Sequence, residues 1–443
     1  MKIITSYNIR LKTEYIFALK QTVMIYTDTI RYFIDVILQE WDNVKDLSSM
    51  SLVNYIESLT HYTDKNINPK YPDFDIKFPK LPCYLRRSAI SSAFGKCKSY
   101  KSSLANWEKA DMNTRGKAPS IPYLTYEMPA FYKGNMFERI NDYDAKLKLF
   151  INNDWQYITV GLRKSDVDYI KHHCSFRTEM SPVLRHNHKV WELCFSFKEK
   201  RDLNDTNIYN QRILAVDLGI NNPCTCSIMT SDGTVLSRHF YKAPVEEDSL
   251  NHKLNKLKKS QQHGSRQTPK KWASVNGMNT MLSRKAAGFI INMAVLYNVD
   301  VIVMENLNIT GKIHGSKKQR LSLWRKRAVQ KQVTLQAHRL GIRIRRVCAK
   351  NTSKLAYDGS GEVLRGHDAD LNTYSLCKFQ TGKIYNCDLS ASYNIGARYY
   401  IREILKSFSE TERLSILAKV PECDKRSTCT LASLIRLNAV LAS

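Results

Sequence analysis

The spacing of apolar and polar residues divides the chain into a helical stretch, a strand-rich stretch and a mixed C-terminal half. Residues 1–11 have the pattern of a first strand, and residues 13–115 have mostly helical spacing. Residues 120–200 contain strand-like runs such as PYLTYEMPAFY, WQYITVGLR and VWELCFSF. We therefore expect a helical segment with strands on both sides of it in the first two hundred residues.

The second half alternates strand patterns with helix patterns. The apolar run ILAV leads into Asp217, and a Ser-Asp-Gly hairpin signal follows it. Another strand-like run leads into Glu305, and a segment with helix-like apolar spacing follows Asp388. The remaining predicted elements are helices over residues 250–262, 274–297 and 322–341, with Gly341 as a stop, and the strand IRIRRV. Hairpin, helix, strand, helix, strand and helix is the order of an RNase H-like α/β domain.

Charge is the strongest compositional signal. The 443 residues include 68 Lys and Arg against 41 Asp and Glu, a formal net charge of +27. Residues 251–350 contain 22 basic residues and only two acidic ones. Such a field binds polyanions by releasing their counterions, so we expect nucleic acid as the partner in preference to an acidic membrane surface. The most apolar early helix, residues 13–41, carries charges at spacings that argue against a membrane span.

The eleven cysteines are scattered, with no CxxC pair, and only Cys224 and Cys226 lie close together. This spacing predicts neither a disulfide framework nor a zinc site built of thiolates. The N-terminus lacks the apolar core and the cleavage site of a signal peptide. We therefore expect reduced thiols and a cytoplasmic location.

Asp217, Glu305 and Asp388 each have an ordinary structural explanation. Asp217 could begin a turn, Glu305 could be a polar strand end, and Asp388 could cap a helix. The α/β order of the surrounding elements favours a joint explanation, because side chains from two strand ends and one helix start can converge. A buried carboxylate without a partner is costly, and a shared cation would neutralise Asp217.

The segments AVDLGINN, VIVMENLNI and NCDLSASYNIGAR resemble the three split motifs of the RuvC-like nuclease domain in transposon-encoded TnpB proteins and compact type V CRISPR effectors. The resemblance covers roughly residues 206–400, and residues 81–107 resemble the helical recognition region of that family. It implies that Asp217, Glu305 and Asp388 are the catalytic, metal-binding residues. Hydrolysis by two cations about 4 Å apart requires oxygen ligands, and magnesium prefers carboxylates and water. Two Mg²⁺ ions are therefore the expected cofactors.

The resemblance also implies a multidomain α/β and α+β fold. It predicts an RNase H-like RuvC nuclease domain and a small N-terminal β-barrel interrupted by a helical recognition domain. The implied ranges are 1–12 and 116–205 for the wedge-like barrel, 13–115 for the recognition domain, 206–351 and 386–405 for the nuclease, 352–385 for a degenerate zinc-ribbon-like insert that binds target nucleic acid, and 406–443 for a C-terminal tail.

Many relatives carry a four-cysteine zinc ribbon in this insert, and this chain departs from that pattern. LAYDGSG stands where the first CxxC pair would be, and CKFQ stands in place of the second. Cys377, Cys387 and His367 supply three ligands at most, whereas a structural zinc takes four. We expect no zinc and two buried structural cysteines. The insert should be a hairpin stabilised by Leu376, Phe379 and Tyr385.

The function implied by the resemblance is RNA-guided DNA cleavage. A guide RNA from a transposon or a CRISPR array would pair with target DNA beside a short motif that the protein reads, in a prokaryotic cytoplasm. Neither that motif nor the oligomeric state follows from the sequence. The basic residues expected to contact nucleic acid are Lys312, Lys317, Lys318, Arg320, Arg325 and Arg327.

Two other functions remain open at this point. A non-cleaving RNA-guided DNA-binding regulator is one, although such relatives usually lack acidic residues that this chain retains. A guide-independent, structure-selective nuclease resembling a junction resolvase is the other, although it would not need the first two hundred residues.

Overall fold

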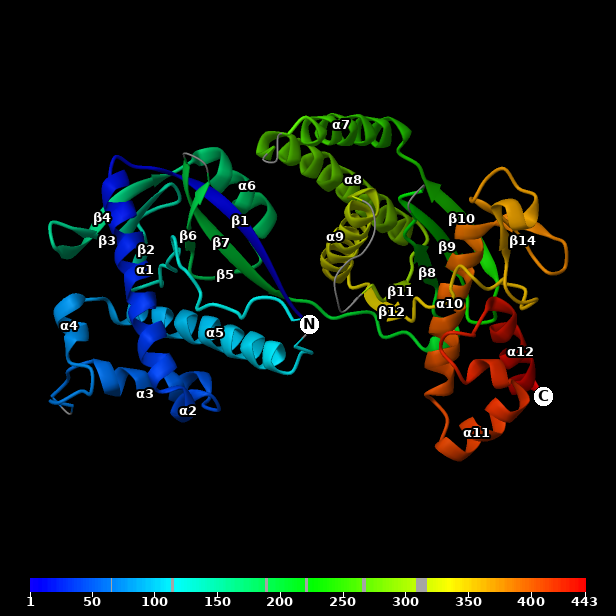
Figure 1. Ribbon diagram of the computed structural model, residues 1–443, viewed down its shortest axis with the longest axis horizontal. Helices are drawn as coiled ribbons and strands as arrows, with labels where there is room; N and C mark the ends of the chain where they lie inside the picture. Colours follow the sequence, from blue (N-terminus) through cyan, green and yellow to red (C-terminus); the bar gives the residue numbers. More distant parts are fainter. Residues whose placement is uncertain (65, 113–114, 188–189, 220–221, 265–267, 308–316) are drawn as a thin grey trace. The chain divides into compact units, whose positions relative to one another are not determined.

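The structure is a computed structural model that describes residues 1–64, 66–112, 115–187, 190–219, 222–264, 268–307 and 317–443 (Figure 1). The chain forms two compact units. The N-terminal unit comprises residues 2–199, and the C-terminal unit comprises residues 200–443 together with Met1. The predicted boundary at residue 205 thus falls inside the C-terminal unit. No helix among the described residues is long and apolar enough to cross a membrane.

The helices of the N-terminal unit are two long ones and several shorter ones. The longest are α1 (Ile16–Gln39) and α5 (Cys83–Glu108), which pack against each other. The buried side chains of α1 recur every three or four residues, as an amphipathic helix requires, at Leu19, Val23, Tyr26, Ile30, Phe33 and Ile37. Between these helices lie the shorter α2 (Trp41–Val44), α3 (Ser49–Thr60) and α4 (Asp73–Lys77).

Seven strands form the sheet of this unit, in the order β2-β3-β4-β1-β7-β5 with β6 also on β7. The first strand of the chain therefore lies in the middle of the sheet. The strands are β1 (Lys2–Lys12), β2 (Phe137–Arg139), β3 (Asp144–Ile151), β4 (Asp154–Leu162), β5 (Thr178–Glu179), β6 (Val183–Asn187) and β7 (Val190–Lys200). These pairings form an open path among the described residues, and closure into a barrel stays a prediction.

One hydrophobic core joins the helices and the sheet of the N-terminal unit, so the segments predicted as a recognition domain and a barrel pack together. The strand-rich prediction for residues 120–200 missed one helix, α6 (Lys164–Cys174). Its buried residues Val167, Ile170 and Cys174 follow helical spacing, a signal that the surrounding strand patterns masked.

The C-terminal unit is built on a five-stranded sheet in the order β10-β9-β8-β11-β12. Strands β8, β11 and β12 are parallel, and β9 and β10 extend the sheet as the predicted antiparallel hairpin. The strands are β8 (Ile213–Asp217), β9 (Cys224–Met229), β10 (Val235–Tyr241), β11 (Val301–Glu305) and β12 (Arg343–Val347). A short 3-10 turn, Ile208–Asn210, precedes them.

Helices cover both faces of this sheet, which makes the strands apolar on both sides. One face packs against α8 (Pro269–Leu296) and α9 (Lys317–Arg339), and the other packs against α10 (Cys387–Leu405). Helix α7 (Pro244–Gln262) packs on α8 (Figure 1). Helices α7 and α8 begin earlier than predicted, each with a proline in its first turn, a position where proline is tolerated. The predicted stop at Gly341 has a left-handed φ of 78°.

The insert is a small antiparallel sheet of β13 (Leu364–Arg365), β14 (Leu376–Lys378) and β15 (Ile384–Asn386), with a 3-10 turn at Gly366–Ala369. Phe379 and both cysteines lie in its core, and Tyr385 packs against them, whereas Leu376 is only half-buried. Cys377 and Cys387 are 0% and 3% exposed, as expected of buried structural cysteines. Whether the insert binds zinc stays a prediction.

The tail, for which the sequence made no structural prediction, is ordered into α11 (Glu410–Lys419), a 3-10 turn at Pro421–Cys423 and α12 (Leu431–Ala442). Capping boxes begin both helices, at Ser409 and at Thr430. Leucines of α12 pack into the same core as α10. The tail is therefore part of the C-terminal unit.

Gly396 allows α10 to lie directly on the sheet. A Cβ atom at this position would come within 2.4 Å of the Met229 sulfur and 3.2 Å of the Ala215 Cβ. Both neighbours are fully buried. A residue with a side chain would therefore push α10 away from β8 and β9.

We expect Gly396→Ala to destabilise the protein by about 1–3 kcal/mol, because it overpacks a buried contact. The matched control is Gly277→Ala in α8, where nothing lies within 4 Å of the added Cβ. The control should be neutral or stabilising by up to about 1 kcal/mol, since alanine is the better helix former. Urea unfolding measures both, and equal effects would contradict the close-packing explanation.

Candidate active site

Asp217 and Glu305 end two neighbouring parallel strands. Met304 pairs with Val216, so the next residue of each strand lies at the same edge of the sheet. Side chains alternate along a strand, and Ala215 and Val303 face α10. The carboxylates two residues further along their strands therefore lie on the α10 face as well.

Asp388 comes from the first turn of α10 and does not cap it. The cap is Asn386, whose side chain accepts a hydrogen bond from the Leu389 amide. The N-cap explanation of Asp388 is therefore wrong, because another residue performs that task. The Asp388 carboxylate accepts a 2.9 Å hydrogen bond from the Asn222 amide, in the loop after β8. The start of α10 is thereby joined to the segment that follows Asp217.

The three carboxylates interact electrostatically. Asp217 is 8% exposed. Burial and the charges of Glu305 and Asp388 together raise its pKa to about 8, burial being the largest cause. Desolvation and like charges both disfavour the ionised form, so Asp217 lies in a site that favours a cation.

Two further residues hold Glu305, and sequence reasoning did not identify them. The buried Thr352 hydroxyl donates to the Glu305 carboxylate, and Gln330 of α9 donates to its backbone carbonyl at 2.7 Å. Asn394 of α10 donates in turn to the Thr352 carbonyl at 3.0 Å. A Thr some 47 residues after Glu305 carries no local signal, since only the fold brings the two together.

Two of the six basic residues predicted to contact nucleic acid hold contacts within the protein. Arg325 is 6% exposed and lies 3.9 Å from the Glu247 carboxylate. The Arg327 guanidinium donates to the Leu307 carbonyl. Lys312 lies outside the described residues, as do the side chains of Lys317, Lys318 and Arg320. Nucleic-acid binding by these six residues stays a prediction.

The burial of Arg325 follows from helical phase. It precedes Val329, Val333 and Ala337 at four-residue intervals, on the face of α9 that enters the core. The apolar spacing of α9 was therefore a signal that could have distinguished this arginine from an exposed one.

Lys326 and Arg365 are the basic residues whose charges lower the pKa of Asp217. Lys326 lies on α9, and Arg365 lies on β13 of the insert. Neither was among the six predicted residues. Both are partly exposed, so they give the edge of the carboxylate site a positive border that favours a phosphate.

The chemistry of these side chains fits a hard divalent cation, because three carboxylates are present and the negative charge of Asp217 is not balanced by nearby positive charges. The side chains do not form a finished ligand set. Within the described ranges, no three His, Cys, Asp or Glu side chains lie where they could hold a metal ion as they stand. Thr352 and Asn222 each donate a hydrogen bond to one of the carboxylates, Glu305 and Asp388 respectively.

Asp217→Asn should stabilise the chelator-treated protein at alkaline pH. Burying Asp217 in ionised form costs free energy of folding. Because the pKa rises from about 4 in the unfolded chain to about 8 in the folded protein, this cost grows as the pH rises from about 4 to about 8 and is complete above about pH 8. The substitution removes this cost, which is on the order of a few kcal/mol. Urea unfolding should therefore show wild type losing stability relative to the variant between about pH 4 and about pH 8.

The exposed Asp202 gives the matched control, Asp202→Asn. It should follow wild type across this pH range. Identical pH profiles for the two variants would contradict the assignment of the cost to the buried carboxylate.

The Aq_aa04 family model matches residues 3–151. The uncharacterized protein aq_aa04 of Aquifex aeolicus (strain VF5) is 28% identical over 127 residues, which cover 26% of this chain and 70% of that protein.

Two solved structures are similar over most of the chain. A Cas12f1–sgRNA–target DNA complex matches with a TM-score of 0.53 and 16% identity, over 85% of this chain and 81% of the other. CasPhi-2 (Cas12j) bound to crRNA and phosphorothioate DNA matches at a TM-score of 0.45 and 10% identity, over 90% and 91%. The first of these shows that the chain has a mixed α/β multidomain fold similar to that of Cas12f1.

Proposed function

We propose that this protein is an RNA-guided DNA endonuclease with a RuvC-like nuclease domain. The observation that carries the proposal is the electrostatic coupling of Asp217, Glu305 and Asp388 at one edge of the sheet. Three separate elements bring carboxylates together there at a cost in stability, an arrangement typical of a functional site. The positive border provided by Lys326 and Arg365 suits a phosphodiester substrate.

The fold similarity supports the guided part of the proposal. The similar Cas12f1 structure is a complex with a guide RNA and target DNA, and the likeness covers both units of this chain. A nuclease that recognises only DNA structure would not need the N-terminal unit. The proposal covers guides of either source, a TnpB-like transposon RNA or a CRISPR RNA.

In this proposal Asp217, Glu305 and Asp388 would hold two Mg²⁺ ions. Bound there, the cations would polarise the scissile phosphodiester for attack by water. Thr352 and Gln330 orient Glu305, and Asn222 orients Asp388. Lys326 and Arg365 would neutralise phosphates that flank the scissile bond.

Asp388→Ala should lower DNA cleavage by more than about a hundredfold. Removing a residue that hydrogen-bonds to a metal ligand costs up to about a hundredfold in activity, and removing the ligand itself should cost more. Binding of guide and target should stay within about threefold of wild type, since no phosphate contact is removed. The measurement is cleavage and binding in magnesium with the RNA that copurifies, using its native targeting end and a rewritten one.

Each alternative function predicts a different outcome of this experiment. Cleavage that follows the rewritten guide supports the proposal. A regulator would bind the rewritten target and leave it intact. A structure-selective nuclease would cut branched DNA whether or not the guide matched. That result would contradict the proposal that an RNA guides cleavage.

Thr352→Val should lower cleavage by roughly 10–100-fold, because it removes the donor that orients Glu305. Thr352→Ser keeps the hydroxyl and should restore most of the activity. Raising the magnesium concentration should partly rescue the valine variant if the lost hydroxyl acts through the metal site. Equal loss in both variants, with no rescue, would show that Thr352 is needed only for packing.

A further inference from the structure

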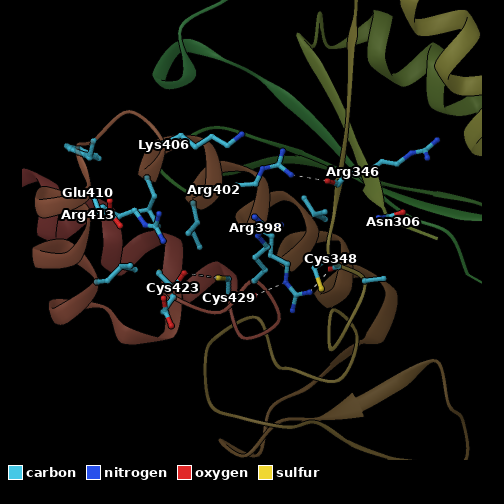
Figure 2. A pocket seen from close by; sticks show the side chains of 18 residues that line it. Asn306, Arg346, Cys348, Arg398, Arg402, Lys406, Glu410, Arg413, Cys423 and Cys429 are labelled. Carbon is cyan, nitrogen blue, oxygen red and sulfur yellow. Dashed lines mark hydrogen bonds between the residues drawn. The ribbon is translucent and has the colours of Figure 1, made fainter. Parts of the chain in front are cut away.

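The tail and the C-terminal half of α10 line a cavity of about 800 Å³, which no local sequence pattern predicts. Figure 2 shows Arg398 and Arg402 on α10 and Lys406 directly after it, with Glu410 and Arg413 of α11 on the other side of the pocket. The opposite end of the pocket is formed by the chain that leaves β11 and β12. This volume lies in the range of pockets that hold ligands of nucleotide size.

The lining of this cavity is strongly basic. Six Lys and Arg residues contribute to it, against two acidic residues, Glu410 and Asp424. The exposed side chains of Arg413 and Arg426 make no ion pair with any residue that the structure describes. Lys406 shares the carboxylate of Glu403 with Arg402, so that one acidic group serves two cations. The cavity therefore has an excess of positive charge.

One of the arginines that line the cavity is buried. Arg398 is 4% exposed, and its guanidinium donates only to carbonyls, those of Cys348, Lys350, Ser427 and Cys429, at 2.7 to 3.1 Å. Carbonyl dipoles satisfy its hydrogen bonds and do not cancel its charge. Burial lowers the pKa of Arg398 but leaves it a permanent cation. The wall of the cavity thus carries a fixed positive charge that no carboxylate in contact neutralises.

Apolar side chains form another part of the same wall. Ile401 and Leu405 of α10, Phe408 after it and Leu417 of α11 line the cavity between the cations. A simple phosphate site would have no use for this surface. The bases of a single strand could use this surface, because bases stack on aromatic and apolar side chains while arginines contact the backbone.

We propose that this cavity binds a short segment of single-stranded nucleic acid, with Arg413 and Arg426 on its phosphodiester backbone and Phe408 beside a base. The shared chemistry is the phosphodiester strand, which either the guide RNA or a DNA strand can supply. The cavity is lined by the second half of α10, whereas Asp388 begins that helix, and the opposite end of the cavity reaches Asn306, the residue after Glu305. It would anchor a strand and would not cut it.

The experiment compares two charge-reversal pairs in the full-length, nucleic-acid-free protein. Arg413→Glu with Arg426→Glu changes the cavity. Lys419→Glu with Lys425→Glu changes the same charge in the same segments, at exposed positions that do not line it. The probes are fluorescein-labelled oligo(U) RNA and oligo(dU) DNA of equal length, titrated in chelator over a series of salt concentrations. Neither a guide nor cleavage is involved, so the result is independent of the proposed nuclease.

The cavity pair should weaken binding of at least one probe by about tenfold or more. The slope of log K against log salt concentration should become about 1.4 less steep, which is about 0.7 for each lost phosphate contact in a single strand. The control pair should change affinity by less than about threefold. Loss for oligo(U) alone assigns the site to RNA, loss for oligo(dU) alone assigns it to DNA, and loss for both supports recognition of the backbone. Equal losses from the two pairs, or no loss from the cavity pair, would overturn the proposal.

Folding of the variants is checked separately. All four substituted residues are exposed, so both pairs should unfold at the wild-type urea midpoint. Phe408→Leu gives a second measurement that reverses no charge: it should weaken binding severalfold without changing the salt slope, because it removes stacking and no phosphate contact. An unchanged affinity for Phe408→Leu would refute the part of the proposal that places a base in the cavity.

Discussion

The C-terminal unit depends on the burial of one carboxylate, Asp217, beside two others. An isolated buried carboxylate is costly, and neighbouring negative charges increase that cost. The fold maintains this arrangement because the strand that ends at Asp217 is fully buried between helices on both faces. The apolar core thus supplies the free energy that holds an unfavourable charge in place.

Helix α10 is the element that joins this site to the rest of the unit. Its first turn carries Asp388, and Gly396 lets its middle lie against the sheet. Asn394 then contacts both the loop that holds Glu305 and the start of α12. Arg398 ties the chain after β12 to the tail through carbonyls. A shift of α10 would therefore move Asp388 and one wall of the basic cavity together.

The two positively charged regions of the C-terminal unit differ in what their charge does. At the carboxylate site, Lys326 and Arg365 partly offset acidic groups, so the local charge is mixed. In the cavity beside the tail, arginines outnumber acidic groups and are backed by the fixed charge of Arg398. In the proposed function, a strand of nucleic acid would be cleaved at the first region and bound only by electrostatic and stacking contacts at the second.

The sequence by itself determined the strands that end at Asp217 and Glu305, the hairpin between them and the helix that follows Asp388, because periodicity and turn residues are local signals. Only the tertiary structure decided that Thr352 and Asn222 contact the carboxylates, that Arg325 is buried while the charge of Lys326 acts on Asp217, and that the tail lines a basic cavity. These features depend on contacts between residues far apart in the chain. Local pattern carries no information about such contacts, because packing alone chooses which distant side chains meet.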